Sequence, residues 1–232
     1  MNSSTLKDSM PIIRRAVQSP APPQETYKLT ADDILDTLPI EYRDAKASPE
    51  FVAEAAAIVK TGSTLLVMGT PGIGKTYQLF GILRNLRMNA AKSAIQTGAT
   101  FAPDYDGKRW RFDTNEAQWR SAKVAKIKAN DAMRIISESS DIRRHRYDHD
   151  QLDAWCGFHG LLAVDDIGFV APTEWVREAI YEIATHRRRD KLATIWTTNL
   201  NAASLDATFG GAITSRLCGG SVLALDGKDR RL

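Results

Sequence analysis

Short, continuous apolar runs recur along the chain, separated by longer stretches in which apolar residues are spaced as on a helix. The runs cover residues 64–68, 161–166, 193–198 and 221–225. Apolar runs of this length indicate strands that are buried on both faces of a sheet. A fifth short strand is expected over residues 110–113.

The intervening stretches predict helices. Apolar residues at helical spacing mark the segments 30–38, 49–60, 76–91, 116–137 and 174–186. Ser204 is expected to cap a further short helix, which ends at Gly210 and Gly211. Strands that alternate with helices in this way form a parallel sheet with helices on both faces. The sequence therefore predicts an α/β fold of three layers with five parallel strands.

The polarity of the chain divides it into three parts. Residues 1–26 hold four prolines among polar residues and are expected to form a flexible arm. Residues 27–60 are expected to form the N-terminal helices, and residues 61–232 the main α/β domain. Within that domain, a basic, helical insertion is expected at about 114–150.

Composition indicates the class of protein and its compartment, but no activity. The 232 residues are 43% hydrophobic and 25% charged, as in ordinary globular domains, and the net charge is only +3. Cys156 and Cys218 lie in no cluster with metal-ligand spacing, so no zinc site is expected and a reducing compartment is favoured. No apolar run approaches the ~20 residues that span a bilayer, and no signal peptide is recognisable. The protein is therefore expected to be cytoplasmic, with no membrane partner.

A glycine-rich loop follows the first predicted strand and opens the next helix. Its eight residues match the pattern GxxxxGK[ST]; they are Gly69, Thr70, Pro71, Gly72, Ile73, Gly74, Lys75 and Thr76. Glycines let the backbone curl around a triphosphate and point N–H groups at it, and the helix adds its positive end. Lys75 is expected to reach the β- and γ-phosphates, and Thr76 to bind Mg²⁺ through its hydroxyl. The alternative, a glycine-rich turn without a ligand, fits this strand–loop–helix context poorly.

Two acidic residues, Asp165 and Asp166, end the second long apolar run. Ligands of parallel sheets bind beyond the carboxyl ends of the strands, so both carboxylates are expected beside the glycine-rich loop. Asp165 is predicted to hold Mg²⁺, directly or through water, and Asp166 to polarise the attacking water. Without the loop, two acids that start a turn before Gly168 would be the simpler interpretation.

Three further residues are candidates for contact with the transferred phosphoryl group. Asn199 ends the strand at 193–198 and is predicted to bond the γ-phosphate or the attacking water; a cap or turn residue is the alternative. Arg216 is predicted to stabilise charge in the transition state, on its own nucleotide or on that of a neighbouring subunit. Arg230 is a similar candidate, and for both arginines a plain surface position is the alternative.

Positive charge is concentrated between residues 119 and 147, where eight basic residues stand against three acidic ones. The basic residues are Arg120, Lys123, Lys126, Lys128, Arg134, Arg143, Arg144 and Arg146. Such a segment can bind the phosphate backbone of a nucleic acid. An equally good interpretation is a helix face exposed to solvent. Three consecutive arginines at 187–189 form a second basic cluster with the same two interpretations.

Taken together, these motifs resemble the AAA+ ATPases of the DnaC/DnaI helicase-loader and IstB transposition group, over residues 30–232. The matching segments are GTPGIGKT at 69–76, LLAVDDIG at 161–168, TTNL at 197–200, TSRL at 214–217 and GKDRRL at 227–232. The resemblance implies that Lys75 and Thr76 are the Walker A pair and that Asp165 and Asp166 are the Walker B pair. It also implies ATP and Mg²⁺ as cofactors and a P-loop NTPase fold of the AAA+ (ASCE) type.

The resemblance gives roles to the remaining candidates as well. Asn199 corresponds to sensor 1, Arg216 to an arginine finger that acts between self-associated subunits, and Arg230 to a terminal sensor arginine. Asp166 is one methylene shorter than the usual AAA+ glutamate, which implies slow hydrolysis. Only 16 residues follow Arg216, too few for the helical lid of many AAA+ proteins, and the loader group also lacks a C-terminal lid.

Three functions remain open on the sequence. The first is a helicase loader, an ATPase that assembles on single-stranded DNA and delivers a replicative helicase. The second is an IstB-like transposition ATPase, and the third is a nucleotide-dependent interaction switch with little turnover. A small-molecule P-loop kinase would need an acceptor site and a closing lid, which no segment of the sequence supplies.

Overall fold

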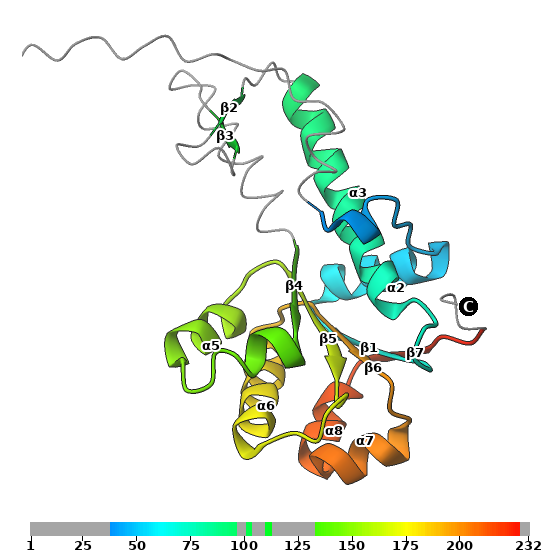
Figure 1. Ribbon diagram of the computed structural model, residues 1–232, viewed down its shortest axis with the longest axis vertical. Coiled ribbons are helices and arrows are strands. Elements are labelled where there is room, and N and C mark those ends of the chain that lie inside the picture. Colours follow the sequence, from blue (N-terminus) through cyan, green and yellow to red (C-terminus); the bar gives the residue numbers. More distant parts are fainter. Residues whose placement is uncertain (1–37, 97–100, 104–109, 113–132, 228–232) are drawn as a thin grey trace, which may run out of the picture.

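A computed structural model describes residues 38–96, 101–103, 110–112 and 133–227, in which helices cover both faces of a parallel sheet (Figure 1). On one face lie α2 (Pro49–Thr61) and α3 (Lys75–Gln96), and on the other lie α5 (His149–Cys156) and α6 (Glu174–Arg189). Two short helices, α7 (Ala202–Phe209) and α8 (Gly211–Leu217), lie on the same face as α6. The three-layer α/β arrangement predicted from the sequence is therefore confirmed.

The strands and remaining short elements complete the described fold. They are η1 (Ile40–Tyr42), β1 (Thr64–Met68), β2 (Phe101–Pro103), β3 (Trp110–Phe112), β4 (Met133–Ser137), η2 (Glu138–Ile142), β5 (Leu161–Ile167), β6 (Thr194–Thr198), α7 (Ala202–Phe209), α8 (Gly211–Leu217) and β7 (Ser221–Ala224).

The main sheet has five strands in the order β4-β5-β6-β1-β7, and every neighbouring pair is parallel. β1 lies between β6 and β7, so Met68 at its end is level with Thr198 and Ala224. The carboxyl ends of β1, β5 and β6 consequently meet at one edge of the sheet. The polar residues that follow these strands are brought together there.

One of the five strands is not the expected one. β3, the strand predicted at 110–113, pairs antiparallel with β2 in a separate two-stranded sheet. The fifth strand of the main sheet is β4, which lies where the sequence suggested the end of a helix over 116–137. Met133 and Ile136 are both buried, and their spacing of three resembles a helix face. The rest of that helix prediction lies outside the described residues.

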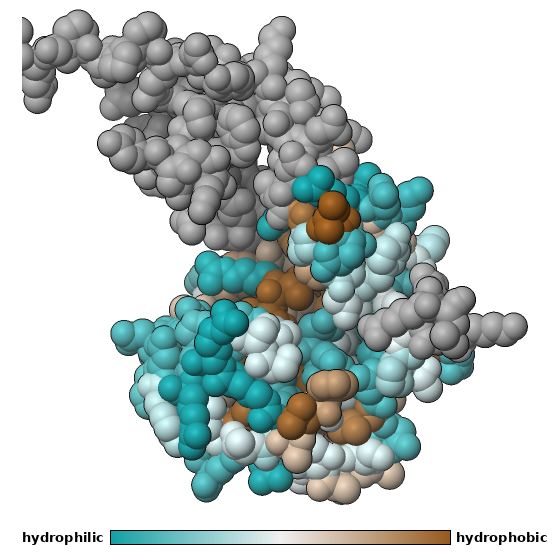
Figure 2. Space-filling model, in the orientation of Figure 1, coloured by the Kyte–Doolittle hydropathy of each residue, from teal (hydrophilic) through white to brown (hydrophobic). Residues whose placement is uncertain are grey.

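Alternate side chains of β1 enter two different hydrophobic cores. Leu65 and Val67 pack with α2 and α3, whereas Leu66 packs with the helices of the opposite face. All three are fully buried, as expected for a central parallel strand. Hydrophilic side chains cover the outer surface over α5 and α6 (Figure 2), so the apolar side chains of these helices turn inward.

Helix ends follow local capping chemistry. Ser48 caps α2 by accepting a hydrogen bond from Phe51 N at 3.2 Å, and Gly62 ends the helix in the left-handed conformation. The cap of α7 is Asn201 rather than the predicted Ser204, whose backbone N–H is the donor to Asn201 at 2.8 Å. α7 nevertheless ends at Gly210, as expected.

The segment before α2 packs closely on α3. A Cβ added at Gly81 would lie 2.3 Å from Ala47 N, so only glycine permits this approach. Ser48 N donates to Gln78 Oε1 at 2.6 Å, and the ring of Tyr42 stacks on Phe80 with centroids 4.1 Å apart. These contacts place Tyr42 near the start of α3. The predicted helix at 30–38 lies outside the described residues, apart from its last position.

Within the described part of the chain, no helix combines the length and the apolar character that a membrane span requires.

Candidate functional site

The glycine-rich loop joins β1 to α3, as predicted. Gly72 and Gly74 have φ angles of +81° and +99°, a conformation that residues with a Cβ rarely adopt. Gly69 approaches Leu225 so closely that a Cβ would lie 2.9 Å from Leu225 O. The loop therefore needs glycine at these positions, and its shape suits an anion bound by backbone N–H groups at the start of a helix.

Lys75 lies inside the loop, with only 6% of the residue exposed. Its Nζ donates to the backbone oxygens of Gly69 at 2.7 Å and Thr70 at 3.0 Å, and to Asn199 Oδ1 at 2.5 Å. The ammonium group is thereby held between the loop and the end of β6. A charge that is buried and fixed in this way binds phosphate oxygens more strongly than a solvated lysine would.

Thr76 and Asp165 lie side by side. Thr76 Oγ1 donates to Asp165 Oδ2 at 2.8 Å, and Thr197 Oγ1 donates to Asp165 Oδ1 at 2.5 Å. Asp165 is only 7% exposed, so both of its oxygens are oriented by hydroxyl groups. A hydroxyl next to a carboxylate is an oxygen donor set of the kind that Mg²⁺ prefers. The residues present therefore fit the ion that the sequence predicted.

Asp166 points away from Asp165, toward Asn199. The strand bulges between Val164 and Ile167, and Asp166 has a φ of +57°. Asn199 Nδ2 donates to Asp166 Oδ1 at 2.6 Å, and Asp166 N donates to Thr197 Oγ1 at 2.8 Å. Burial raises the pKa of the Asp166 carboxyl above its ordinary value; the charge of Asp165 adds to this, and the charge of Lys75 opposes it.

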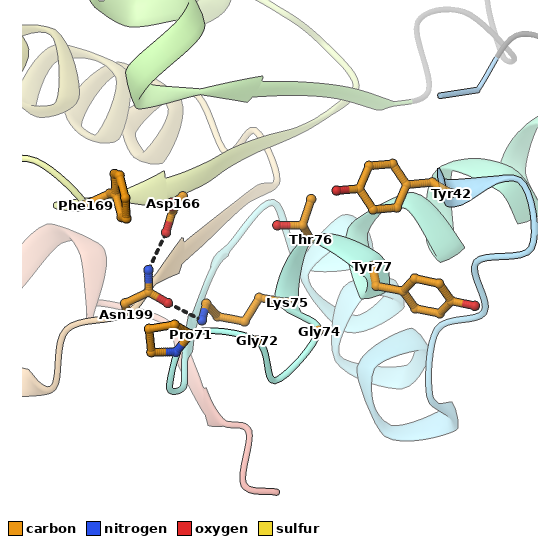
Figure 3. Close-up of a pocket in the computed structure, with 10 residues that line it drawn as sticks. All are labelled: Tyr42, Pro71, Gly72, Gly74, Lys75, Thr76, Tyr77, Asp166, Phe169 and Asn199. Carbon is orange, nitrogen blue, oxygen red and sulfur yellow. Dashed lines mark hydrogen bonds between the residues drawn. The ribbon is translucent and has the colours of Figure 1, made fainter. Parts of the chain in front are cut away.

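Four of the predicted polar residues, Lys75, Thr76, Asp166 and Asn199, line one cavity of about 490 Å³ at the carboxyl edge of the sheet. Figure 3 shows Asn199 between Asp166 and the Lys75 ammonium group, with a hydrogen bond to each, and Thr76 at the start of α3. The lining residues are Tyr42, Pro71, Gly72, Gly74, Lys75, Thr76, Tyr77, Asp166, Phe169 and Asn199. The cavity has space for a nucleotide, and its walls combine a cation, hydroxyls, an acid and aromatic rings.

Three aromatic residues of the cavity were missed by the sequence analysis. Tyr77 immediately follows the glycine-rich loop and Phe169 follows the acid pair, so their positions in the sequence were a usable signal. Tyr42 had no such signal, because only the packing of the preceding segment on α3 brings it to the cavity. Tyr77 Oη is anchored by donating to Asp44 O at 2.8 Å.

Of the two candidate arginines, only Arg216 lies among the described residues, and it does not line the cavity. Arg216 lies on α8, and its guanidinium is held against α6. Nε donates to Thr185 Oγ1 at 2.8 Å, Nη2 donates to Tyr181 Oη at 3.0 Å, and the group lies 4.3 Å from the centroid of the Tyr181 ring. Arg230 lies outside the described residues.

The basic cluster at 187–189 separates into buried and exposed side chains. Arg187 is only 1% exposed and donates to the carbonyl oxygens of Trp155, Phe158 and Gly160 at 3.0, 2.6 and 2.9 Å. Burial lowers its pKa to about 10, which leaves the guanidinium charged at neutral pH. A nucleic-acid role is therefore wrong for Arg187, whereas Arg189 is exposed and pairs with Asp190.

Several basic side chains of the segment at 119–147 make contacts within the chain. Arg134 lies over the ring of Phe158 at 4.5 Å, and Arg146 over that of Tyr147 at 4.6 Å. Arg143 forms a salt bridge of 2.6 Å with Glu138. Arg144 is exposed, and the basic residues from 120 to 128 lie outside the described residues.

Comparison with solved structures finds several similar proteins. The structure is similar to the crystal structure of DnaI, with a TM-score of 0.52 and 17% identity over 88% of this chain and 94% of that chain. The crystal structure of the DnaC helicase loader gives a TM-score of 0.49 at 20% identity, over 83% of this chain and 96% of that one. DnaA, a replication initiator solved with AMPPCP and single-stranded DNA, gives 0.48 at 15%, over 77% and 45%.

No protein-family model matches the sequence, and no curated protein matches it either. The likeness to DnaI, at 17% identity, shows a shared fold. The strand order and this structural neighbour therefore confirm the predicted three-layer α/β fold with a five-stranded parallel sheet.

Proposed function

We propose that the chain is an ATP-binding and ATP-hydrolysing AAA+ protein that acts as a replicative helicase loader on single-stranded DNA. One observation carries the nucleotide part of this proposal. Lys75 and Thr76 from the loop, Asp166 from β5 and Asn199 just after β6 line a single cavity, although these three segments are far apart in the sequence. A cleft with only a structural role does not require a cation, a hydroxyl, an acid and an amide to converge on one cavity.

ATP is expected to place its β- and γ-phosphates in the loop, against the backbone N–H groups and Lys75 Nζ. Mg²⁺ would be held by Thr76 Oγ1 and Asp165, where it would neutralise phosphate charge. The aromatic rings of Tyr42, Tyr77 and Phe169 offer surfaces for the apolar parts of the nucleotide.

Hydrolysis requires a group that orients and polarises water, and Asp166 is the proposed group. Asn199 bridges Asp166 and Lys75, so it connects the water-activating carboxylate with the phosphate-binding ammonium. Arg216 lies outside its own cavity and is proposed to act at the nucleotide of a neighbouring subunit. Self-association is thus part of the proposal.

The partners follow from the resemblance of the motifs to the DnaC/DnaI group and from the fold shared with DnaI. A replicative helicase and single-stranded DNA are the proposed partners, and the cytoplasm is the proposed compartment. Arg144 and the basic residues from 120 to 128 are the proposed contacts to the DNA backbone.

A nucleotide-dependent switch with little turnover is the second candidate, and the short side chain of Asp166 favours it. Asp166 already shares a hydrogen bond with Asn199, and an aspartate reaches less far toward a bound water than a glutamate would. In this function, nucleotide binding alone would alter the Lys75–Asn199–Asp166 contacts and thereby the surface offered to a partner.

Three measurements test the proposal. Calorimetry with ATP and Mg²⁺ on the folded chain is expected to show binding, and phosphate release is expected to rise with single-stranded DNA. Binding without release under any condition supports the switch. Co-purification from the native host, probed for a hexameric helicase and for a transposase, tests the partner; capture of a transposase would contradict the loader function.

A further inference from the structure

A buried glutamate outside the predicted site is bonded to the loop that follows the acid pair. Glu138 comes directly after β4, next to β5 in the sheet, and its side chain is only 2% exposed. Its Oε2 accepts a hydrogen bond from Gly168 N at 2.6 Å, and its Oε1 accepts one from Arg143 Nη2 at 2.6 Å. A carboxylate is buried at low cost only when both oxygens are paired in this way.

Arg143 extends this contact along the same loop. Its Nη2 also donates to Val170 O at 3.0 Å and lies 3.2 Å from Ala171 O. The two side chains are neighbours because η2 is a π-helical turn, in which Arg143 N bonds to Glu138 O at 3.1 Å. Glu138 and Arg143 thus bind three backbone groups of residues 168–171.

The loop needs such support because its backbone is unusual and its side chains are poorly buried. Gly168 has a φ of +77°, two residues after Asp166 with +57°. Phe169 is 67% exposed and Val170 48% exposed, so neither anchors the loop by burial. Phe169 nevertheless lines the nucleotide cavity beside Asp166, as Figure 3 shows. Its position depends on how the backbone of 168–171 is held.

We infer that Glu138 and Arg143 are positioning residues for hydrolysis, which hold residues 166–171 so that Asp166 and Phe169 keep their places in the cavity. This inference rests on the proposed function. Neither residue lines the cavity. Their side chains are hydrogen-bonded to each other and to residues 168–171, and not to the glycine-rich loop as the described residues show it. Loss of the pair is therefore expected to slow turnover and to leave nucleotide affinity nearly unchanged.

Glu138→Gln tests the inference with almost no change in volume. The amide must place its NH₂ group against either Arg143 or Gly168 N–H, both of which are donors, so one of the two bonds is lost. We expect kcat to fall by about tenfold or more, because small displacements of reacting groups have large effects on rate. KM for ATP and Kd for a non-hydrolysable analogue are expected to change by less than about twofold, the size of a weak hydrogen-bond change.

Amide hydrogen exchange of residues 166–171 gives a readout that does not depend on activity. It is expected to be slow in the wild-type chain and faster in Glu138→Gln. Arg189→Gln is the matched control, since it removes one charge from the exposed Arg189–Asp190 pair. This control is expected to change neither exchange in 166–171 nor kcat.

A double variant separates positioning from stability. Glu138→Met with Arg143→Met leaves no unpaired buried charge, so it is expected to fold even where a single variant does not. It is expected to bind nucleotide with wild-type affinity and still turn over slowly. Wild-type turnover in this variant, or unchanged exchange in Glu138→Gln, would overturn the inference. A wild-type chain without nucleotide affinity would instead contradict the proposed function. The exchange experiment would still test whether Glu138 and Arg143 hold residues 166–171 in place.

Discussion

Lys75 Nζ and Asn199 Oδ1 lie 2.5 Å apart, although the two residues are 124 positions apart in the chain. Asn199 uses its other end to donate to Asp166, so one amide connects a cation with an acid. Because an amide has a distinct donor and acceptor, it can serve both neighbours at once. The three side chains form one unit, and changes to them are expected to have effects that do not add.

Lys75→Met is expected to weaken ATP binding at least tenfold. The substitution removes the only cation among the described residues that line the cavity, and it leaves the stem of the side chain in place. Loss of a charge-assisted contact to phosphate predicts an affinity at least tenfold weaker, from ~1.5–3 kcal/mol for such a bond. Calorimetry with ATP and Mg²⁺ measures it, and unchanged affinity would contradict the assigned site.

Asp166→Asn is expected to abolish phosphate release while ATP binding persists. The φ of +57° at this position does not confound the result, because asparagine tolerates the left-handed conformation as well as aspartate does. Asparagine cannot accept a proton from water, so a loss of about a hundredfold or more in kcat is expected. A variant that retains wild-type turnover would remove Asp166 from the proposed chemistry.

Thr76→Val is expected to weaken the dependence of ATP binding on Mg²⁺. Valine keeps the shape of the side chain but lacks the hydroxyl that donates to Asp165 and is the proposed ligand. Affinity for ATP should then be similar with Mg²⁺ and with EDTA, whereas the wild-type chain binds more tightly with Mg²⁺. Titration of ATP under both conditions measures the difference, and a retained Mg²⁺ effect would argue against this ligand.

Arg216→Ala and Lys75→Ala are each expected to be inactive alone and to recover activity when mixed. A Lys75→Ala subunit still carries Arg216 and can supply it to an intact site on its neighbour. Arg177→Ala is a suitable control, since Arg177 is an exposed arginine that donates to Thr208 O. Phosphate release measured across mixing ratios should pass through a maximum. Its absence at every ratio would contradict a finger that acts between subunits.

Arg187→Met is expected to lower the free energy of unfolding by about 3 kcal/mol or more, because several buried carbonyl oxygens lose their donor. For a chain of this size, that corresponds to a fall in Tm of roughly 6–12 °C. Arg189→Met, two residues further along on an exposed side chain, is expected to leave Tm nearly unchanged. Thermal unfolding followed by circular dichroism compares the two variants, and equal Tm values would contradict the buried role of Arg187.

The sequence predicted most of the sheet because its central strands are continuous apolar runs whose length excludes a helix. β1 was predicted with the bounds that the structure shows, and the site residues at the ends of β1, β5 and β6 follow from the parallel arrangement. β4 was missed because Met133 and Ile136 have the spacing of a helix face and lie on an edge strand buried in part only. Periodicity alone does not separate these cases in so short a segment.

Contacts between distant segments account for what else was missed. Arg187 has the same local sequence as its exposed neighbours, and only the carbonyl groups around it distinguish them. Glu138 reads as one acid in a basic stretch, because its partners Gly168 and Arg143 are brought to it by a π-helical turn and by strand pairing. Such residues are recognised only when the backbone path is known.

The central place of β1 has a consequence for how the chain must be made. Both of its partners, β6 and β7, are translated more than a hundred residues after it. During synthesis on the ribosome, this mostly apolar strand has both of its edges unpaired while the greater part of the domain is still being made. Because of this order of strands along the chain, β1 needs protection before its partners are made. Local collapse onto α2 and α3, or a chaperone, would provide it.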